Sequence, residues 1–431
     1  MRHRPPLPRI YWHEQRPQEA RLLPPLAREI QTEVVVVGGG VAGLSCAQAL
    51  SEQGRRVVLL EKDTCGGGAS GRSSGFITPD AEMELSDLVR NRGPEKAKRL
   101  WEFVVGGVDA IRANIERHGI DCDMQVQDSL FLANSRKGAA VVGDEHEARQ
   151  SLGYGSTLYD AATIRSVLGS NECCGGVRYP GTFGINAYLY CHAMRDILRR
   201  SGVVVHERSP VTGIGEGQVT ANGYTVRADA VVLCLDCFLP ELGVLSKEVY
   251  HAQTFLAVSA PLTDVQIAAI FPESKLMVWD TDLIYQYFRV TGDNRLLLGA
   301  ASMLYTYDRR ERAGAPRILR KMRAFLARKF PLVPVEIEYF WPGLIGVSKD
   351  FIPIAARDAP HSTLFFVSGA TGLPWAAALG RYMAEKIQSN RSDFDAEFDP
   401  RRRFPVEHFV QSLIGTPNAF ALSHGIVKYL R

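Results

Sequence analysis

The hydrophobic and polar positions of the chain follow two patterns. In the first, short runs of consecutive apolar residues alternate with helical stretches, as at Val34–Val37, Val57–Leu60, Ala230–Leu235 and Leu364–Val367. Such runs are typical of strands buried on both faces of a parallel sheet. In the second, between about 249 and 342, apolar and polar residues alternate at Tyr250–Ala260, Leu283–Val290 and Arg295–Ala301. This alternation predicts an antiparallel sheet, with a helix over Arg317–Lys329.

The remaining stretches add helices and shorter strands. Helical spacing of apolar residues predicts helices from Val41 to about Gln53 and over Ala187–Arg200. Between Leu85 and His118 the pattern is also helical, with a core face made of Leu88, Trp101, Val104, Val105, Val108, Ile111 and Ile115. Further strands are expected at Val126–Ala133, Val203–His206 and, beside a hairpin turn at Asn222-Gly223, Val219–Val226.

Composition narrows the class of protein. The chain has 431 residues, of which 46% are hydrophobic and 23% charged, as in soluble proteins of two or three domains. A net charge of +3 is too small to favour nucleic acid as a partner, and no apolar run is long enough to span a membrane. The eight scattered cysteines and the absence of a secretory signal in Met1–Arg28 predict a cytoplasmic protein. No metal site is expected, because the Cys234/Cys237 pair has no second pair at zinc spacing.

The turn after the first strand carries the candidate chemistry. Residues 38–43 read GGGVAG, a GxGxxG in which Gly38 permits a tight turn, Gly40 lets the backbone approach a pyrophosphate and Gly43 lets the helix pack closely. The helix that follows offers free N–H groups to phosphates. Glu61 ends the second strand about 20 residues later, where an acidic side chain binds ribose hydroxyls and repels an NADP phosphate. The alternative is a turn that binds no ligand and a surface carboxylate. It does not explain the spacing between the glycines and Glu61.

A second glycine-rich loop follows the ribose-binding strand. Residues 66–74 read GGGASGRSS, a small and polar backbone that suits close passage along a long cofactor. Arg72 within it could balance phosphate charge or meet an anionic substrate. A solvated flexible loop is the alternative. The loop favours FAD over NAD.

The sequence resembles the D-amino-acid oxidase superfamily of flavoproteins. The resemblance rests on VVVVGGGVAGLSCAQALSEQGRRVVLLEKD, GGGASGRSSGFITP, SPVTGI, ADAVVLCLDCF and LFFVSGATGLPWAAALGRYMAEKI, in the same order from Glu33 to Ile387. The nearest group is the γ-glutamylputrescine oxidases, beside the glycine and sarcosine oxidases, because of the GASGR-type loop and the Trp12-containing arm.

The pattern and the resemblance together predict an α/β protein. A discontinuous Rossmann-type FAD-binding domain is expected over 30–90, 175–247 and 343–395, with a second α+β substrate domain on a mixed, largely antiparallel sheet over 91–174 and 248–342. Residues 1–29 would form an N-terminal arm and 396–431 a C-terminal extension.

The resemblance implies which residues bind FAD. Beyond the first turn, it places them in the second loop, in SPVTGI, at the end of the ADAVVLC strand and at the start of the last helix. The full set is Gly38, Gly40, Val41, Ala42, Gly43, Glu61, Lys62, Ala69, Ser70, Arg72, Ser73, Ser74, Val211, Cys234, Gly369, Thr371, Gly372 and Leu373. Thr371 is a candidate N-cap and Pro374 suits the first turn of that helix, whose dipole would stabilise the reduced flavin.

Three positions depart from the family pattern. No cysteine lies between Trp341 and Phe351, so the FAD is expected to be non-covalent. Leu297 stands where sarcosine oxidases have a lysine that promotes reaction with oxygen, so the electron acceptor is oxygen or another molecule. The usual histidine of the last glycine loop is replaced near Leu373.

The resemblance implies oxidation of a C–N bond, with hydride transfer to flavin N5 and hydrolysis of the resulting imine. Because the reacting amine must be neutral, the pocket should be apolar and aromatic, and no side-chain base is assigned. The aromatic candidates are Tyr285, Tyr287, Trp341 and Trp375, each equally compatible with core packing. Arg72, Arg289 and Lys349 are candidates to bind a substrate carboxylate, with a solvated surface charge as the alternative for the last two.

Two other functions compete with an amine or amino-acid oxidoreductase. A non-catalytic or assembly subunit with structural FAD could use the C-terminal extension, rich in Phe409, Leu413, Phe420 and Ile426, to dock on a partner protein. Wrapping of that extension over its own domain is the commoner case. An NAD-dependent dehydrogenase is disfavoured by the length and by the second loop.

Overall fold

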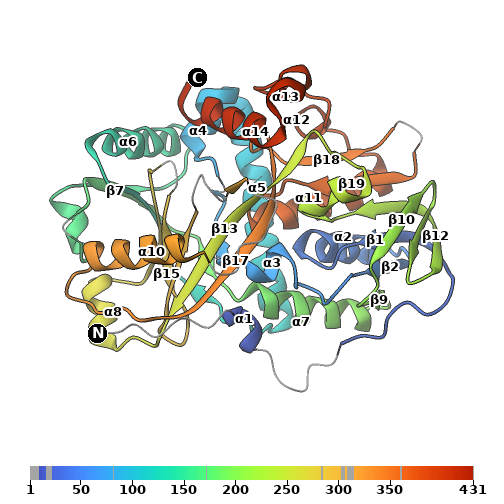
Figure 1. The fold of residues 1–431 in the computed structure, drawn as a ribbon, viewed down its shortest axis with the longest axis horizontal. Coiled ribbons are helices and arrows are strands. Elements are labelled where there is room, and N and C mark those ends of the chain that lie inside the picture. Colours follow the sequence, from blue (N-terminus) through green and yellow to red (C-terminus); the bar gives the residue numbers. More distant parts are fainter. Residues whose placement is uncertain are drawn as a thin grey trace.

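Two large sheets dominate the computed structural model, which describes residues 9–15, 22–80, 82–170, 172–282, 285–301, 306–307, 315–359 and 362–430. In Figure 1 one sheet, around β1 and β12, lies on the right, and the other, around β13 and β15, lies on the left. Together they give the predicted α/β architecture with a Rossmann-type sheet and a mixed second sheet.

The first sheet has the strand order β10-β11-β12-β1-β2-β9, with β19 beside β12 and β18 beside β19. Its parallel strands are β1 (Ile30–Val37), β2 (Val57–Leu60), β9 (Val204–His206), β12 (Tyr224–Leu233) and β19 (Leu364–Ser368). The antiparallel members are β10 (Val211–Gly215), β11 (Gln218–Ala221) and β18 (Ile354–Arg357). All four residues of Val34–Val37 are buried, which confirms the expectation drawn from the apolar run.

Helices cover this sheet and join it to the rest of the chain. They are α2 (Val41–Glu52), α7 (Ala187–Arg200) and α11 (Leu373–Ser389), with α5 (Pro94–His118) packed on α11. The helical stretch from Leu85 to His118 is two helices, because Gly93 with φ 80° separates α4 (Leu85–Arg92) from α5. The predicted core face is buried except for Val105, which is half-buried.

One strand prediction was wrong. Residues Val219–Val226 and Ala230–Leu235 were expected as two strands, whereas β12 runs without a break from Tyr224 to Leu233. The Asn222-Gly223 turn lies between β11 and β12, with φ 52° and 83°. The sequence suggested two strands because the first half of β12 carries exposed polar residues, whereas its last four residues are all buried.

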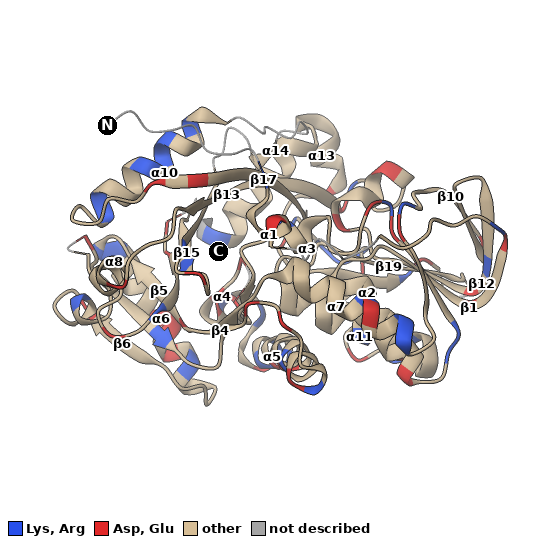
Figure 2. Cartoon of the chain, turned by 90° about the horizontal axis from the view of Figure 1, so that it is seen from below, with Lys and Arg blue, Asp and Glu red and all other residues tan. Residues whose placement is uncertain are grey.

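The second sheet has the order β17-β13-β16-β15-β14-β5-β7-β6, and all its pairs are antiparallel except β14 with β5. Its strands are β5 (Asp128–Ala133), β6 (Thr157–Asp160), β7 (Gly175–Tyr179), β13 (Val249–Ser259), β14 (Leu276–Asp280), β15 (Tyr287–Val290), β16 (Leu296–Ala300) and β17 (Ile337–Ser348). Residues 283 and 284 of the predicted strand Leu283–Val290 lie outside the described residues. The helices α6 (Arg136–Ser151), α8 (Asp264–Ile270) and α10 (Pro316–Lys329) accompany it, and Figure 2 shows the basic residues of α10 along its length.

Short elements connect the two sheets. A three-stranded sheet joins β3 (Phe76–Ile77), β8 (Phe183–Gly184) and β4 (Gln125–Val126). The other connections are α3 (Ala69–Arg72) and the 3-10 turns η1 (Thr163–Ser166) and η2 (Asp236–Leu242). The predicted domain boundaries stay a prediction. Two strands do not follow these boundaries. Strand β7 belongs to the second sheet, although it lies within 175–247 of the predicted FAD-binding domain, and β17 runs across the predicted boundary at 342.

The described parts of the N-terminal arm and of the C-terminal extension pack on the rest of the chain. In the N-terminal arm, α1 (Tyr11–Glu14) buries Trp12, whose Nε1 donates a hydrogen bond of 2.8 Å to the carbonyl of Ser73. The C-terminal extension forms α12 (Asp395–Phe398), α13 (His408–Ile414), α14 (Thr416–Gly425) and the π-helical turn η3 (Ile426–Leu430). Phe420 of α14 is fully buried against Tyr250, Ala252 and Val347. Among the described residues, no helix is long and apolar enough to cross a membrane.

Candidate functional site

The glycine turn after β1 is too crowded for side chains. A Cβ on Gly38, whose φ is 111°, would lie 2.2 Å from the carbonyl oxygen of Cys234, and one on Gly43 would lie 1.9 Å from the oxygen of Gly38. Helix α2 begins at Val41 without a side-chain cap on Gly40. The backbone is therefore exposed to a ligand at a helix N-terminus, which suits a pyrophosphate.

Glu61 lies across this turn at the end of β2. Its carboxylate accepts hydrogen bonds from the amides of Gly39 (2.7 Å) and Asp63 (3.0 Å). Burial raises the pKa of Glu61 and these amides act against the rise. The position at the carboxyl edge of the parallel strands is the one predicted for ribose binding. The neighbouring Lys62 is exposed and pairs with Asp63 at 3.0 Å.

The second loop is held in place on both sides. Ser70 Oγ accepts from the amide of Val41 at 3.1 Å, which ties α3 to the start of α2. The carbonyl of Arg72 accepts from Trp341 Nε1 at 3.1 Å, and Arg72 Nε donates to the carbonyl of Gly67 at 3.3 Å. A Cβ on Gly71 would lie 2.1 Å from the oxygen of Gly66. The alternative of a solvated flexible loop does not agree with this packing.

The last glycine loop differs from the prediction in one detail. Helix α11 begins at Leu373 with Gly372, φ 110°, as its N-cap and without a side-chain cap. Thr371 is therefore not the N-cap. It lies one residue before Gly372, which caps the helix with a positive φ. Its hydroxyl is buried and has no hydrogen-bond partner among the described residues. Such a group requires a partner from outside the protein.

The remaining predicted cofactor residues lie beside these loops. Val211 begins β10, and Cys234 follows β12, where its amide donates to the carbonyl of Val37 at 2.8 Å. Ala42 is in the first turn of α2, and a Cβ on Gly380 of α11 would lie 2.2 Å from its oxygen. The glycine cradles, the two uncapped helix starts and the orphaned Thr371 hydroxyl fit an elongated FAD along the edge of the first sheet.

The two candidate cations outside the loops are not surface charges. Arg289 is fully buried and donates to the carbonyls of Ser74 (2.9 Å) and Ile185 (2.8 Å). Lys349 is also fully buried and donates to the carbonyl of Val406 at 3.3 Å. Burial lowers the pKa of Lys349 to about 8. The alternative of a solvated charge is wrong for both, since each binds backbone oxygens instead.

The two tryptophans are buried among other aromatic residues. Trp375 lies in the main core beside the rings of Phe103 and Phe398, at centroid distances of 5.8 and 6.2 Å. Trp341 belongs to a separate cluster with Tyr11 and Trp12.

Tyr285 and Tyr287 lie together, with their ring centroids 5.7 Å apart. Phe76, two residues after the second loop, meets Tyr287 edge-on at 5.8 Å. The hydroxyl of Tyr285 donates to Glu82 at 2.9 Å. Through Phe76, these two tyrosines lie beside the second loop, which Trp341 also contacts.

These tyrosines belong to an aromatic cluster that extends to residues that the sequence pattern did not indicate. They are Glu82, Tyr307, Phe351, His424 and Lys428. His424 stacks on Phe351 at 4.0 Å, and its ring nitrogens meet the hydroxyl of Tyr307 (2.6 Å) and the carbonyl of Ser348 (2.8 Å). Ser348 in turn adjoins the last glycine loop, because a Cβ on Gly369 would lie 3.3 Å from its amide nitrogen. No local motif marks these positions, which come together only in the fold.

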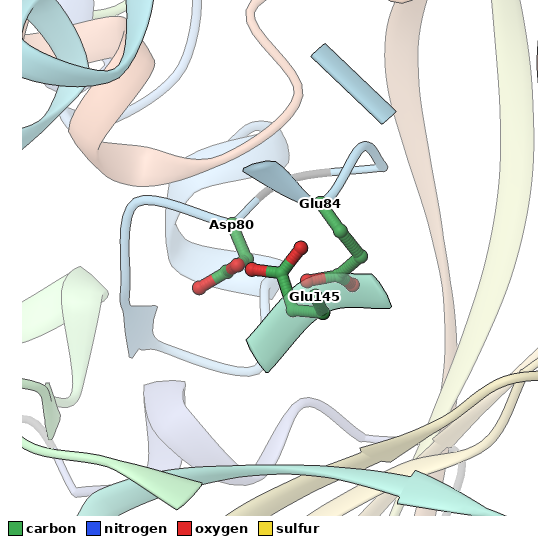
Figure 3. A group of neighbouring side chains, drawn as sticks. All are labelled: Asp80, Glu84 and Glu145. Atoms are coloured by element: carbon green, nitrogen blue, oxygen red, sulfur yellow. The ribbon is translucent and has the colours of Figure 1, made fainter. Parts of the chain in front are cut away.

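Three carboxylates, of which Glu145 is fully buried and Glu84 half-buried, lie next to this cluster. Asp80, Glu84 and Glu145 point toward one another in Figure 3, within 4.8 Å. Arg149 bonds Asp80 at 2.8 Å and Glu145 at 2.7 Å, and Trp279 Nε1 donates to Glu84 at 2.8 Å. Burial raises the pKa of Glu84, and the charges of Asp80 and Glu145 raise it further. The guanidinium supplies the positive charge of this group, which anchors the start of α4 to α6.

Comparisons with known proteins identify the family and the fold. A family model described as FAD dependent oxidoreductase matches residues 33–386. The chain is 29% identical to gamma-glutamylputrescine oxidoreductase of Escherichia coli, over 86% of this chain and 87% of that protein. It is 28% identical to the probable oxidoreductase OrdL of Haemophilus influenzae, over 88% of both chains. The structure of glycine oxidase from Geobacillus kaustophilus has the same fold, with a TM-score of 0.74 at 21% identity over 87% of this chain and 100% of that one.

Proposed function

The chain belongs to the family of FAD-dependent oxidoreductases, and from this premise we propose that it oxidises the C–N bond of an amine or amino acid. The observation that carries the proposal is the aromatic cluster between the two predicted flavin loops, with Phe76 at one side and Ser348 at the other. Relatives named as a gamma-glutamylputrescine oxidoreductase and a glycine oxidase support the same substrate class.

The residues of this chain would act by binding and orientation. When bound, FAD supplies the acceptor for the hydride. The glycine turns hold its phosphates through backbone N–H groups, and Glu61 accepts from its ribose hydroxyls. The uncapped start of α11 directs positive helix potential at the flavin, which stabilises negative charge there. The rings of Phe76, Tyr285 and Tyr287 exclude water, which favours the neutral form of an amine.

The electron acceptor is a separate part of the proposal. Leu297 is fully buried in β16, near Trp12 and Trp341, so its position presents an isobutyl group in place of an ammonium. We propose slow reaction with oxygen and an acceptor other than oxygen in the cell.

Location and partners complete the proposal. All eight cysteines are unpaired thiols, which supports a reducing compartment such as the cytoplasm. Phe409 and Leu413 of α13 are 75% and 70% exposed and are the residues of the C-terminal extension through which a partner protein would bind.

An anaerobic titration with a panel of amines and amino acids tests the proposal. Bleaching of the flavin absorbance by at least one member is expected, followed by slow recovery on admission of air. A flavin that no amine reduces would instead support a structural role for FAD.

A further inference from the structure

A half-buried carboxylate lies among the rings of the aromatic cluster. Glu82, in the connection from β3 to α4, has a φ of 52°, which an ordinary residue adopts only when its surroundings hold it there. Tyr285 donates to its Oε1 at 2.9 Å. Burial raises the pKa of Tyr285, Tyr287 and Tyr307, and the negative charge of Glu82 is the next cause for each of them. Tyr285 and Tyr287 from one segment and Tyr307 from another therefore lie near one carboxylate, and Tyr285 binds it directly.

An alkylammonium of the chain itself lies against two rings of this cluster. Lys428, in the turn η3, holds its Nζ 5.4 Å from the ring centroid of Tyr285 and 5.6 Å from that of Phe351. Both distances are within the range of cation–π attraction. The rings of Tyr285 and Phe351 thus accept a primary ammonium on a four-carbon stem.

The charges around the cluster favour a cation over a carboxylate. Arg289 and Lys349, the residues expected to bind a substrate carboxylate, donate to backbone oxygens instead. A substrate carboxylate beside Glu82 would meet its negative charge, whereas an ammonium would be stabilised there.

We propose that Glu82, together with the rings of Tyr285 and Phe351, binds a cationic group of the substrate, and that Lys428 occupies the same place when no substrate is bound. The inference rests on the proposed function and specifies its substrate class. The amine that is oxidised must be neutral, so the group held at Glu82 is a second one. The preferred substrates are amines that carry a further positive charge, as diamines do.

Binding of a quaternary ammonium tests the cation site without turnover. The probe is choline, its neutral isostere is 3,3-dimethylbutan-1-ol, and isothermal titration calorimetry on the FAD-loaded protein gives both affinities. Choline should bind about tenfold more tightly than the alcohol, as for a cation on rings at a partly buried site. Glu82→Gln should abolish this preference. Lys428→Met should tighten choline binding severalfold, because it removes the competing ammonium.

A control variant and a second substrate pair separate the outcomes. Glu95→Gln, an exposed carboxylate at the start of α5, should keep the full preference for choline. Equal affinities for choline and the alcohol in both the wild-type protein and Lys428→Met would overturn the inference, as would an unchanged preference in Glu82→Gln. In anaerobic flavin reduction, 1,4-diaminobutane should show a KM at least tenfold below that of butylamine. If choline binds as expected but no amine reduces the flavin, the proposed function fails and the cation site stands.

Discussion

The cofactor region and the aromatic cluster are built from different parts of the polypeptide. Along the edge of the first sheet the contacts are backbone ones, at glycines where a Cβ would overlap a neighbouring carbonyl, as at Gly38 and Gly43. In the aromatic cluster the contacts are side-chain ones, between rings and a carboxylate such as those of Tyr285 and Glu82. A site formed by backbone groups tolerates few substitutions, whereas the affinity of a site formed by side chains changes by a small amount with each substitution. Substitutions should therefore affect FAD content in the first region and substrate affinity in the second.

The largest effect is expected for Gly38→Ala. The added Cβ would lie 2.2 Å from the oxygen of Cys234 in a residue with φ 111°. Overlap and strain together should cost about 2–5 kcal/mol of stability and most of the bound FAD, measured by denaturation and by absorbance. Gly54→Ala is the control, because Gly54 has φ 80° and no atom within 4 Å of a Cβ. It should cost about 1–2 kcal/mol and retain FAD. Equal losses in both variants would contradict the comparison.

Next in size is Glu61→Gln. The substitution removes the negative acceptor at the end of β2 and should weaken FAD binding by about 1.5–3 kcal/mol, or roughly 10- to 150-fold in dissociation constant. Fluorescence titration of the apoprotein with FAD measures it. Asp63→Asn, at the exposed neighbouring carboxylate, should change the constant less than threefold. An unchanged constant in Glu61→Gln would exclude the ribose role.

A comparable effect concerns the pH dependence of stability. Burial lowers the pKa of Lys349 to about 8 in the folded protein, from 10.5. Between these values the unfolded chain binds the extra proton, so this group makes the folded state more stable as the pH rises from 8 to 10.5. Lys349→Met should remove a rise of about 2–3 kcal/mol, seen in denaturation curves across that range. Lys247→Met, at an exposed lysine, should preserve the wild-type slope; a steeper slope in Lys349→Met would refute the assignment.

The smallest effect is expected for Tyr285→Phe. Loss of the hydroxyl that donates to Glu82 should change the KM for an amine about two- to fivefold, with FAD content unchanged. Steady-state kinetics with 1,4-diaminobutane measure it, and Tyr224→Phe on the exposed edge of β12 serves as the control. A loss of FAD in Tyr285→Phe would show that the cofactor region and the aromatic cluster are not independent.

The same contrast explains what the sequence could predict. The glycine turn, Glu61 and the second loop are contiguous in the chain, and each glycine has a steric reason that can be anticipated locally. The cap of α11 was misplaced by one residue, because the φ of Gly372 depends on the loop before it. The burial of Arg289 and Lys349 was missed, since their partners are carbonyls distant in the sequence. Glu82, Phe351 and Lys428 meet only through the packing of the C-terminal extension, which no local pattern encodes.

The most direct test of FAD dependence is the flavin content of the purified protein, measured by its visible spectrum before and after heat denaturation. We predict a yellow protein with about one FAD per chain, and a supernatant that contains all of the flavin, because the segment Trp341–Phe351 contains no cysteine to attach it. A colourless protein that takes up no added FAD would contradict the assignment of the cofactor site.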